Sequence, residues 1–89
     1  PNFYIVKRDL GCPWESKGAV MRKIIYDYRN KGLELLDGIK LHTESGWVLI
    51  VPDADKPIFK VIAESSSSRK ANELCDKYCT YLENIINNT

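Results

Sequence analysis

The sequence has little surplus charge and no long apolar run. Thirteen Lys and Arg oppose twelve Asp and Glu, which gives a formal net charge of +1. This balance does not support binding to nucleic acid or to a membrane surface, because both need a concentrated basic face. No apolar run approaches the roughly 20 residues that span a bilayer, and no signal peptide opens the chain. We therefore expect a cytoplasmic domain with neither a nucleic acid nor a membrane as partner.

Cysteine is scarce, with three residues and no C-x-x-C pair. An odd number of cysteines without a secretory signal indicates reduced thiols. Cys75 and Cys79 are one helical turn apart and share a face. With Cys12 and the single His42 they would make four zinc ligands, but these come from three separate segments and lack the usual spacing. The preferred interpretation makes Cys75 and Cys79 small core residues, and no metal site is predicted.

The length suits one domain. A chain of 89 residues buries roughly 60–65% of its unfolded surface, enough for one modest core. The chain begins with Pro1 rather than Met, so we expect residues 1–89 to be a single domain cut from a longer protein.

Apolar periodicity predicts short strands between two helices. The strands are expected at Phe3 to Val6, Leu33 to Leu36, Ile39 to Thr43, Trp47 to Val51 and Ile58 to Glu64. The first helix should start near Trp14 to Ser16 and end at Asn30. The second should run from Arg69, with the serines Ser65 to Ser68 capping it.

Turn residues connect these elements. Gly32 follows the first helix, where a left-handed cap is favoured, and Asp37-Gly38 is a strong signal for a tight hairpin. The order strand, helix, four strands, helix predicts an α+β fold, in which two helices pack on one face of a mostly antiparallel sheet of about four to five strands.

A charged loop without glycine, Pro52 to Pro57, joins the last two strands. It should lie at the rim of the sheet, where a ligand could meet it. Asp53 and Asp55 would suit a divalent cation only with further oxygen ligands, so an Asx-turn formed by Asp53 is the preferred interpretation.

Three other side chains were considered as binding or catalytic groups. Trp47 could stack on a sugar ring, but its place in an alternating strand favours packing on the sheet. His42 has no Ser or Cys partner at a catalytic spacing and is interpreted as a partly exposed strand residue. Trp14 could anchor the first helix or dock on a preceding domain, and the sequence leaves both open.

The run DGIKLHTESGWVLIVPDADKPIFKVIAESSS, from Asp37 to Ser67, resembles the C-terminal domain of the α-D-phosphohexomutases, which include phosphomannomutase and phosphoglucomutase. The matching residues are Asp37, Gly38, Lys40, Gly46, Trp47, Pro52, Pro57, Ala63 and Glu64. The resemblance implies the TATA-box-binding-protein-like fold of that domain. It also implies a role in completing the active site of a carbohydrate isomerase, where the loop holds the phosphate of the sugar.

A second segment, CPWESKGAVMRKI from Cys12 to Ile24, looks like a branch of this family in which a sugar-1-phosphate nucleotidyltransferase is fused ahead of the mutase-like region, as in mannose-1-phosphate guanylyltransferase-like proteins. The resemblance implies that the upstream domains of the same polypeptide are the partner. Those domains would hold the catalytic phosphoserine and Mg²⁺, so this domain should have no catalytic residue, no cofactor and no metal ion of its own.

The loop departs from the family pattern R-P-S-G-T-E-P. In that pattern hydroxyls, glycine amides and an arginine converge on a dianion. Here the five non-proline positions are Val51, Asp53, Ala54, Asp55 and Lys56. Two aspartates would each repel a phosphate by roughly 1–3 kcal/mol at an effective dielectric constant of about 20, and Lys56 compensates only as a point charge.

We therefore expect the degenerate loop, made of Pro52, Asp53, Ala54, Asp55, Lys56 and Pro57, not to bind a hexose phosphate in the family manner. The leading interpretation is a capping domain of a phosphohexomutase-like protein. The alternative is a non-catalytic structural or interaction module of a nucleotidyltransferase fusion protein.

Overall fold

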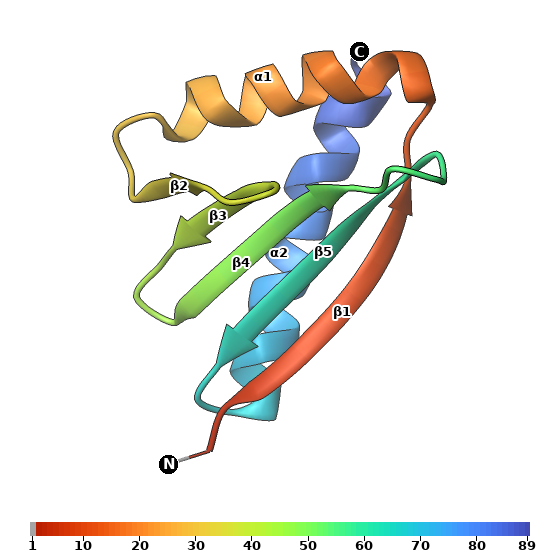
Figure 1. The fold of residues 1–89 in the computed structure, drawn as a ribbon. Coiled ribbons are helices and arrows are strands. Elements are labelled where there is room, and N and C mark those ends of the chain that lie inside the picture. Colours follow the sequence, from red (N-terminus) through yellow and green to blue (C-terminus); the bar gives the residue numbers. More distant parts are fainter. Residues whose placement is uncertain (1) are drawn as a thin grey trace.

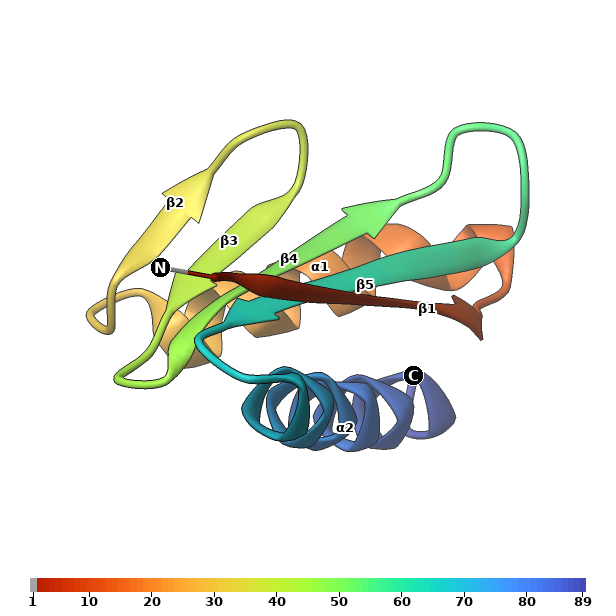
Figure 2. The ribbon, with the colours of Figure 1, turned by 90° about the horizontal axis from the view of Figure 1, so that it is seen from below.

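The computed structural model describes residues 2–89, which form one antiparallel sheet with two helices on one of its faces (Figures 1 and 2). The five strands lie in the order β1-β5-β4-β3-β2. Their bounds are Tyr4–Gly11 for β1, Leu33–Leu35 for β2, Ile39–His42 for β3, Gly46–Pro52 for β4 and Ile58–Ser65 for β5. The α-helices are Lys17–Tyr28 (α1) and Ser68–Asn87 (α2), and a 3₁₀ turn, Trp14–Ser16, precedes α1. The predicted α+β fold is confirmed.

The two helices cover different parts of the same face. Helix α2 runs beneath the sheet and contacts β1, β5 and β4, whereas α1 crosses one end and contacts β3 (Figure 2). Both contribute to one core, whose fully buried members include Val20, Ile24, Ile39, Leu41, Val48, Ile50, Phe59, Val61, Cys75 and Leu82. Burial of each large apolar side chain contributes about 1.5–3 kcal/mol, so this shared core holds the helices to the sheet.

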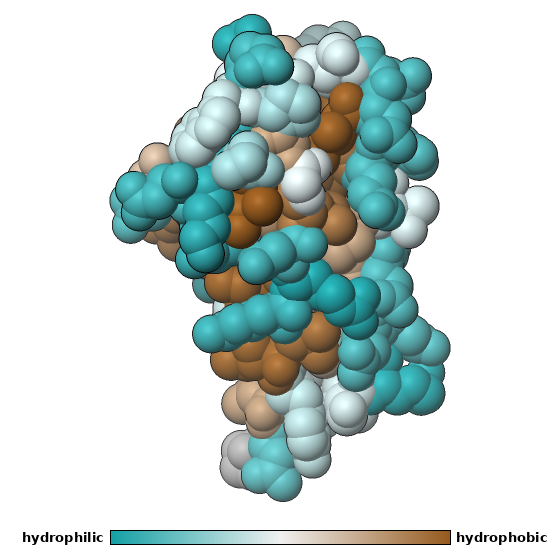
Figure 3. Space-filling model, turned by 90° about the vertical axis from the view of Figure 1, so that its right-hand side faces the viewer, coloured by the Kyte–Doolittle hydropathy of each residue, from teal (hydrophilic) through white to brown (hydrophobic). Residues whose placement is uncertain are grey.

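Strand alternation decides which side chains enter the core. In β4, Val48 and Ile50 point to the helices, while Trp47, Leu49 and Val51 lie half-buried on the opposite face. This opposite face carries no helix within residues 2–89 (Figure 2). Figure 3 looks onto the side of the molecule that carries β1 and shows apolar surface in its middle, crossed by hydrophilic side chains.

Most element bounds agree with the prediction to within one or two residues, and three differences affect the description of the fold. Strand β1 extends to Gly11 rather than ending at Val6, since all eight of its residues pair with β5. Helix α1 ends at Tyr28, and Gly32 has the expected left-handed conformation, with φ of 75°. Only one serine of the predicted capping run caps α2, because the hydroxyl of Ser67 accepts from the backbone N–H of Lys70 at 3.1 Å. Ser65 instead is buried at the end of β5.

Within the described residues, none of the helices has both the length and the apolar character needed to traverse a lipid bilayer.

Candidate functional site

The loop between β4 and β5 lies at the end of the sheet where β1 finishes and α1 begins (Figure 1). Three backbone hydrogen bonds fix its two ends. The N–H of Asp53 donates to the carbonyl of Ile58 at 3.0 Å, and the N–H of Ile58 donates to the carbonyl of Lys56 at 2.8 Å. The N–H of Cys12, just after β1, donates to the carbonyl of Pro57 at 2.8 Å. The loop is therefore tied to the sheet on both sides.

The carboxylate of Asp53 folds back onto its own loop. Its Oδ1 atom accepts hydrogen bonds from the backbone N–H groups of Asp55 at 2.7 Å and Lys56 at 2.9 Å. Its Oδ2 atom lies 3.4 Å from the Nζ atom of Lys60. The amide of Asp55 above all, with the amide of Lys56 and the ammonium of Lys60, lowers the pKa of Asp53 below its usual value. The predicted Asx-turn is confirmed.

Lys17 holds the same loop from the opposite side. Its Nζ atom donates to the backbone carbonyls of Asp53 at 2.5 Å and Lys56 at 2.6 Å. The ammonium also lies 3.9 Å from the centre of the Trp14 ring, a cation–π distance. The side chain is almost completely buried, with 8% of the residue exposed. A buried lysine with three such partners is satisfied, and it fixes the loop to the start of α1.

Lys17 was not among the predicted site residues. It follows a 3₁₀ turn at the start of an amphipathic helix, where a lysine is ordinarily a solvated surface residue. Its partners are 36 and 39 positions away along the chain. The local sequence therefore gives no sign of this contact.

The other predicted loop residues form the tip. Ala54, Asp55, Lys56 and Pro57 are exposed, and Val51, at the position of the family arginine, is half-buried on the open face of the sheet. Asp53 is drawn inward by its hydrogen bonds, while Asp55 remains at the surface. The structure therefore presents a loop whose most ordered carboxylate is already engaged.

Metal binding by a cluster of three or more residues is not supported. Within residues 2–89 no group of three or more His, Cys, Asp and Glu side chains is placed to hold an ion. The alternative of a four-ligand zinc site is therefore wrong, and all three cysteines are buried in the core as free thiols.

Trp47 and His42 lie away from the loop. Trp47 is near the start of β4, at the opposite end of the strand from Pro52. Its indole N–H donates to a carboxylate oxygen of Glu64 at 2.8 Å, and the Nζ atom of Lys40 lies 4.5 Å from the ring centre. The expected packing of Trp47 on the sheet is confirmed. His42 is exposed and pairs with Glu34 on the neighbouring strand.

Trp14 is the aromatic residue beside the loop. About half of it is exposed, and the ammonium of Lys17 covers one face of its ring. This position fits the interpretation of Trp14 as an anchor for the start of the first helix.

Comparison with known proteins adds a family to this geometry. No family model matches the chain. Nearly all of it, 97%, aligns with a probable phosphoglucosamine mutase of Methanopyrus kandleri at 30% identity, covering 20% of that protein. A probable phosphoglucosamine mutase of Pyrococcus furiosus is 32% identical over 86% of the chain and 18% of its own length. The corresponding values for the phosphoglucosamine mutase of Methanocaldococcus jannaschii are 30%, 86% and 18%.

The homology supports a domain of the phosphohexomutase family. The chain spans about a fifth of the length of the curated relatives it matches.

Proposed function

We propose that this chain is the C-terminal, substrate-capping domain of a phosphohexomutase-type protein that acts in sugar-phosphate metabolism in the cytoplasm. The homology with phosphoglucosamine mutases and the position of the loop at the rim of the sheet support this role. The domain contributes no catalytic group. The reaction and the Mg²⁺ ion belong to other domains of the parent protein, with a sugar-1-phosphate nucleotidyltransferase upstream of them.

We further propose that the loop does not hold a sugar phosphate in the family manner, and one observation carries this part. The carboxylate of Asp53 accepts from the backbone amides of Asp55 and Lys56. Free amides of a turn are the groups that bind a phosphate in such loops. An incoming dianion would have to displace a carboxylate that is bound from within, and would meet the negative charge of Asp55 as well.

A purely structural role is the second candidate, and the contact of Lys17 favours it. An ammonium that bridges two loop carbonyls from beneath keeps the loop in one conformation without any ligand. A loop fixed in this way could serve as a rigid wall against the upstream domains of the same polypeptide.

The test of the loop is a titration of the ¹⁵N-labelled chain with glucosamine 6-phosphate up to millimolar concentrations. We expect no saturable shift of the backbone amides from Asp53 to Lys56. Asp53→Ala should then gain binding, because it removes one charge and frees two amides. Asp55→Ala is the matched control, since it removes the same charge and leaves the Asx-turn in place.

Saturable shifts of these four amides in the unaltered chain would contradict a self-occupied loop. Equal gains in Asp53→Ala and Asp55→Ala would show that net charge alone, rather than occupation of the amides, prevents binding. The wider role in a mutase is tested by the sequence that precedes Pro1 in the parent. A serine-centred phosphorylation loop and an acidic metal loop there would support an active enzyme, and their loss would favour the structural module.

A further inference from the structure

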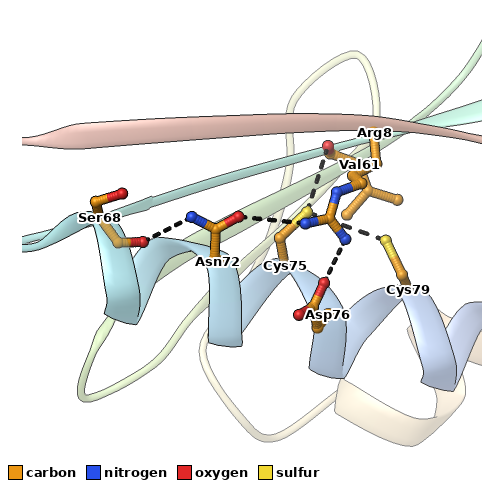
Figure 4. Close-up of polar contacts among 7 residues, drawn as sticks. All are labelled: Arg8, Val61, Ser68, Asn72, Cys75, Asp76 and Cys79. Carbon is orange, nitrogen blue, oxygen red and sulfur yellow. Dashed lines mark hydrogen bonds and ion pairs between the residues drawn. The ribbon is translucent and has the colours of Figure 1, made fainter.

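Two thiols meet in the core between α2 and the sheet. Cys75 and Cys79 lie one turn apart on α2, and their Sγ atoms are 4.0 Å from each other (Figure 4). Cys75 is fully buried and Cys79 is 7% exposed. The Sγ atom of Cys75 also lies 4.0 Å from the carbonyl oxygen of Val61 on β5. The two sulfur atoms thus face each other in the core, where Cys79 is the more exposed of the two.

A guanidinium lies over this pair. Arg8 reaches from β1 towards α2, where Asp76 forms an ion pair with it and the side-chain oxygen of Asn72 accepts from its Nη2 atom at 3.3 Å (Figure 4). Asn72 is held in turn, because its amide donates to the carbonyl of Ser68 at 2.9 Å. Burial raises the pKa of both thiols, and the positive charge of Arg8 offsets this in part by favouring their thiolate forms.

We propose that Cys75 and Cys79 form a two-coordinate site for a soft monovalent cation of the Cu(I) class. Soft thiolates select such ions. The sulfurs are 4.0 Å apart and must separate slightly to place an ion between them, which a small rotation of the two side chains would allow. Binding replaces two S–H bonds by two S–metal bonds and releases two protons to water. The resulting anionic complex of one cation and two thiolates lies beside the guanidinium of Arg8.

The surroundings of the pair exclude harder ions. Zn²⁺ takes four ligands in structural sites, and no third His, Cys, Asp or Glu joins the pair within the part of the chain that the structure describes. Asp76 points to Arg8 at the surface rather than to the sulfurs (Figure 4). The site therefore favours metal ions that are satisfied by two ligands over ions that need four.

Ag(I), a redox-stable ion of the same class, is the probe. The reduced chain is titrated against a competing chelator, and the stoichiometry is read by native mass spectrometry. We expect one tightly bound Ag(I) per chain. Cys79→Ala and Cys75→Ala should each weaken binding at least tenfold, while Cys12→Ala, which removes the remote thiol, should not. Arg8→Gln should weaken binding by about tenfold or more through loss of the neighbouring charge.

Circular dichroism of each variant shows whether it is folded, and Cys79→Ala is the gentler of the two site variants because Cys79 lies at the edge of the core. The proposal is overturned if the Cys75→Ala/Cys79→Ala double variant binds one Ag(I) as tightly as the unaltered chain. It is also overturned if equimolar Zn²⁺ displaces Ag(I), since that would require ligands beyond the two thiols.

Discussion

At the scale of single residues, two oppositely charged side chains fix the loop between β4 and β5. The carboxylate of Asp53 binds two amides of the loop, and the ammonium of Lys17 binds two of its carbonyls. Each charge therefore satisfies backbone groups that would otherwise need water. Because Lys17 comes from the start of α1, the loop and that helix are ordered together.

Replacing Lys17 with methionine should loosen the loop, while the space taken by the lysine stem stays filled. Methionine keeps the apolar stem, whereas the two charge-assisted hydrogen bonds are lost, which costs about 1.5–3 kcal/mol in the free energy of unfolding. We expect faster hydrogen exchange at the amides of Asp55 and Lys56, together with a lower midpoint in urea. Lys56→Met is the control because that side chain is exposed at the loop tip. Unchanged exchange rates in Lys17→Met would show that the ammonium does not order the loop.

Local rules predict some of these residues and fail for others. The Asx-turn of Asp53 follows from a short-range preference of aspartate in turns, so it could be predicted. The contact of Lys17 joins positions more than thirty residues apart, and no sequence pattern carries such information. The zinc alternative failed for the same reason, since pairing Cys12 and His42 with α2 requires knowledge of the packing.

At the scale of elements, Gly46 at the start of β4 leaves no room for a side chain beside β5. A Cβ atom added to Gly46 would lie 1.9 Å from the carbonyl oxygen of Glu64, and the φ angle of 155° is one that other residues rarely adopt. Backbone cannot move aside as a flexible side chain can. Glycine is thus required where the chain enters β4.

Substituting Gly46 with alanine should disrupt the start of the β4–β5 pair. We expect a loss of about 2–4 kcal/mol in the free energy of unfolding, measured by urea denaturation. Gly11→Ala is the matched control, because a Cβ atom there meets nothing within 4 Å. A loss no larger in Gly46→Ala than in Gly11→Ala would mean that the two strands can separate at this point without cost.

The existence and type of the elements could be predicted more readily than their ends. Alternating apolar residues predicted β4 and β5 nearly to the residue. The sequence predicts too short a strand for β1, because Lys7 to Asp9 are polar. These residues nevertheless continue the pairing with β5. Polar side chains are tolerated there, since β1 is an edge strand with one open face.

At the scale of the whole molecule, the two helices are joined by a polar contact beside an aromatic cluster. The hydroxyl of Tyr81 on α2 donates to Asp27 on α1 at 2.6 Å, and the Nζ atom of Lys23 lies 3.0 Å from the same carboxylate. The rings of Tyr28, Tyr78 and Tyr81 pack together at centroid distances of 5.5 to 6.3 Å. These contacts set how α1 lies across α2.

The contribution of this contact should depend on pH. The hydrogen bond from Tyr81, followed by that from Lys23, lowers the pKa of Asp27. Its stabilisation is therefore fully present above the unfolded pKa of about 3.9, and it is lost as the pH falls through the lower folded value. We expect Tyr81→Phe to be less stable by about 1–2 kcal/mol at pH 7, with the difference shrinking below pH 4.

Urea denaturation of both proteins between pH 2 and pH 7 measures this difference. Tyr26→Phe, which removes a hydroxyl from an exposed tyrosine on α1, is the control and should leave the pH dependence unchanged. A constant difference between Tyr81→Phe and the unaltered chain across this range would show that the ionised form of Asp27 is not the partner.

The fold class could be predicted because helix, strand and turn signals agreed along the chain. The sequence does not predict how α1 crosses α2. It also does not predict which face of the sheet carries the helices and which face is open. Leu49 and Val51 are about as apolar as the core residues Val48 and Ile50, so hydropathy alone does not tell the two faces of β4 apart.

The length of β4 separates the two ends of the sheet. Phe3 shares a hollow with the turn from Thr43 to Gly46, at the end of β4 opposite Pro52. The beginning of the chain and the charged loop therefore lie at opposite poles of the molecule (Figure 1). An affinity tag or a fluorophore attached ahead of Phe3 would leave the loop unobstructed, so the chain can be immobilised at one pole and probed at the other.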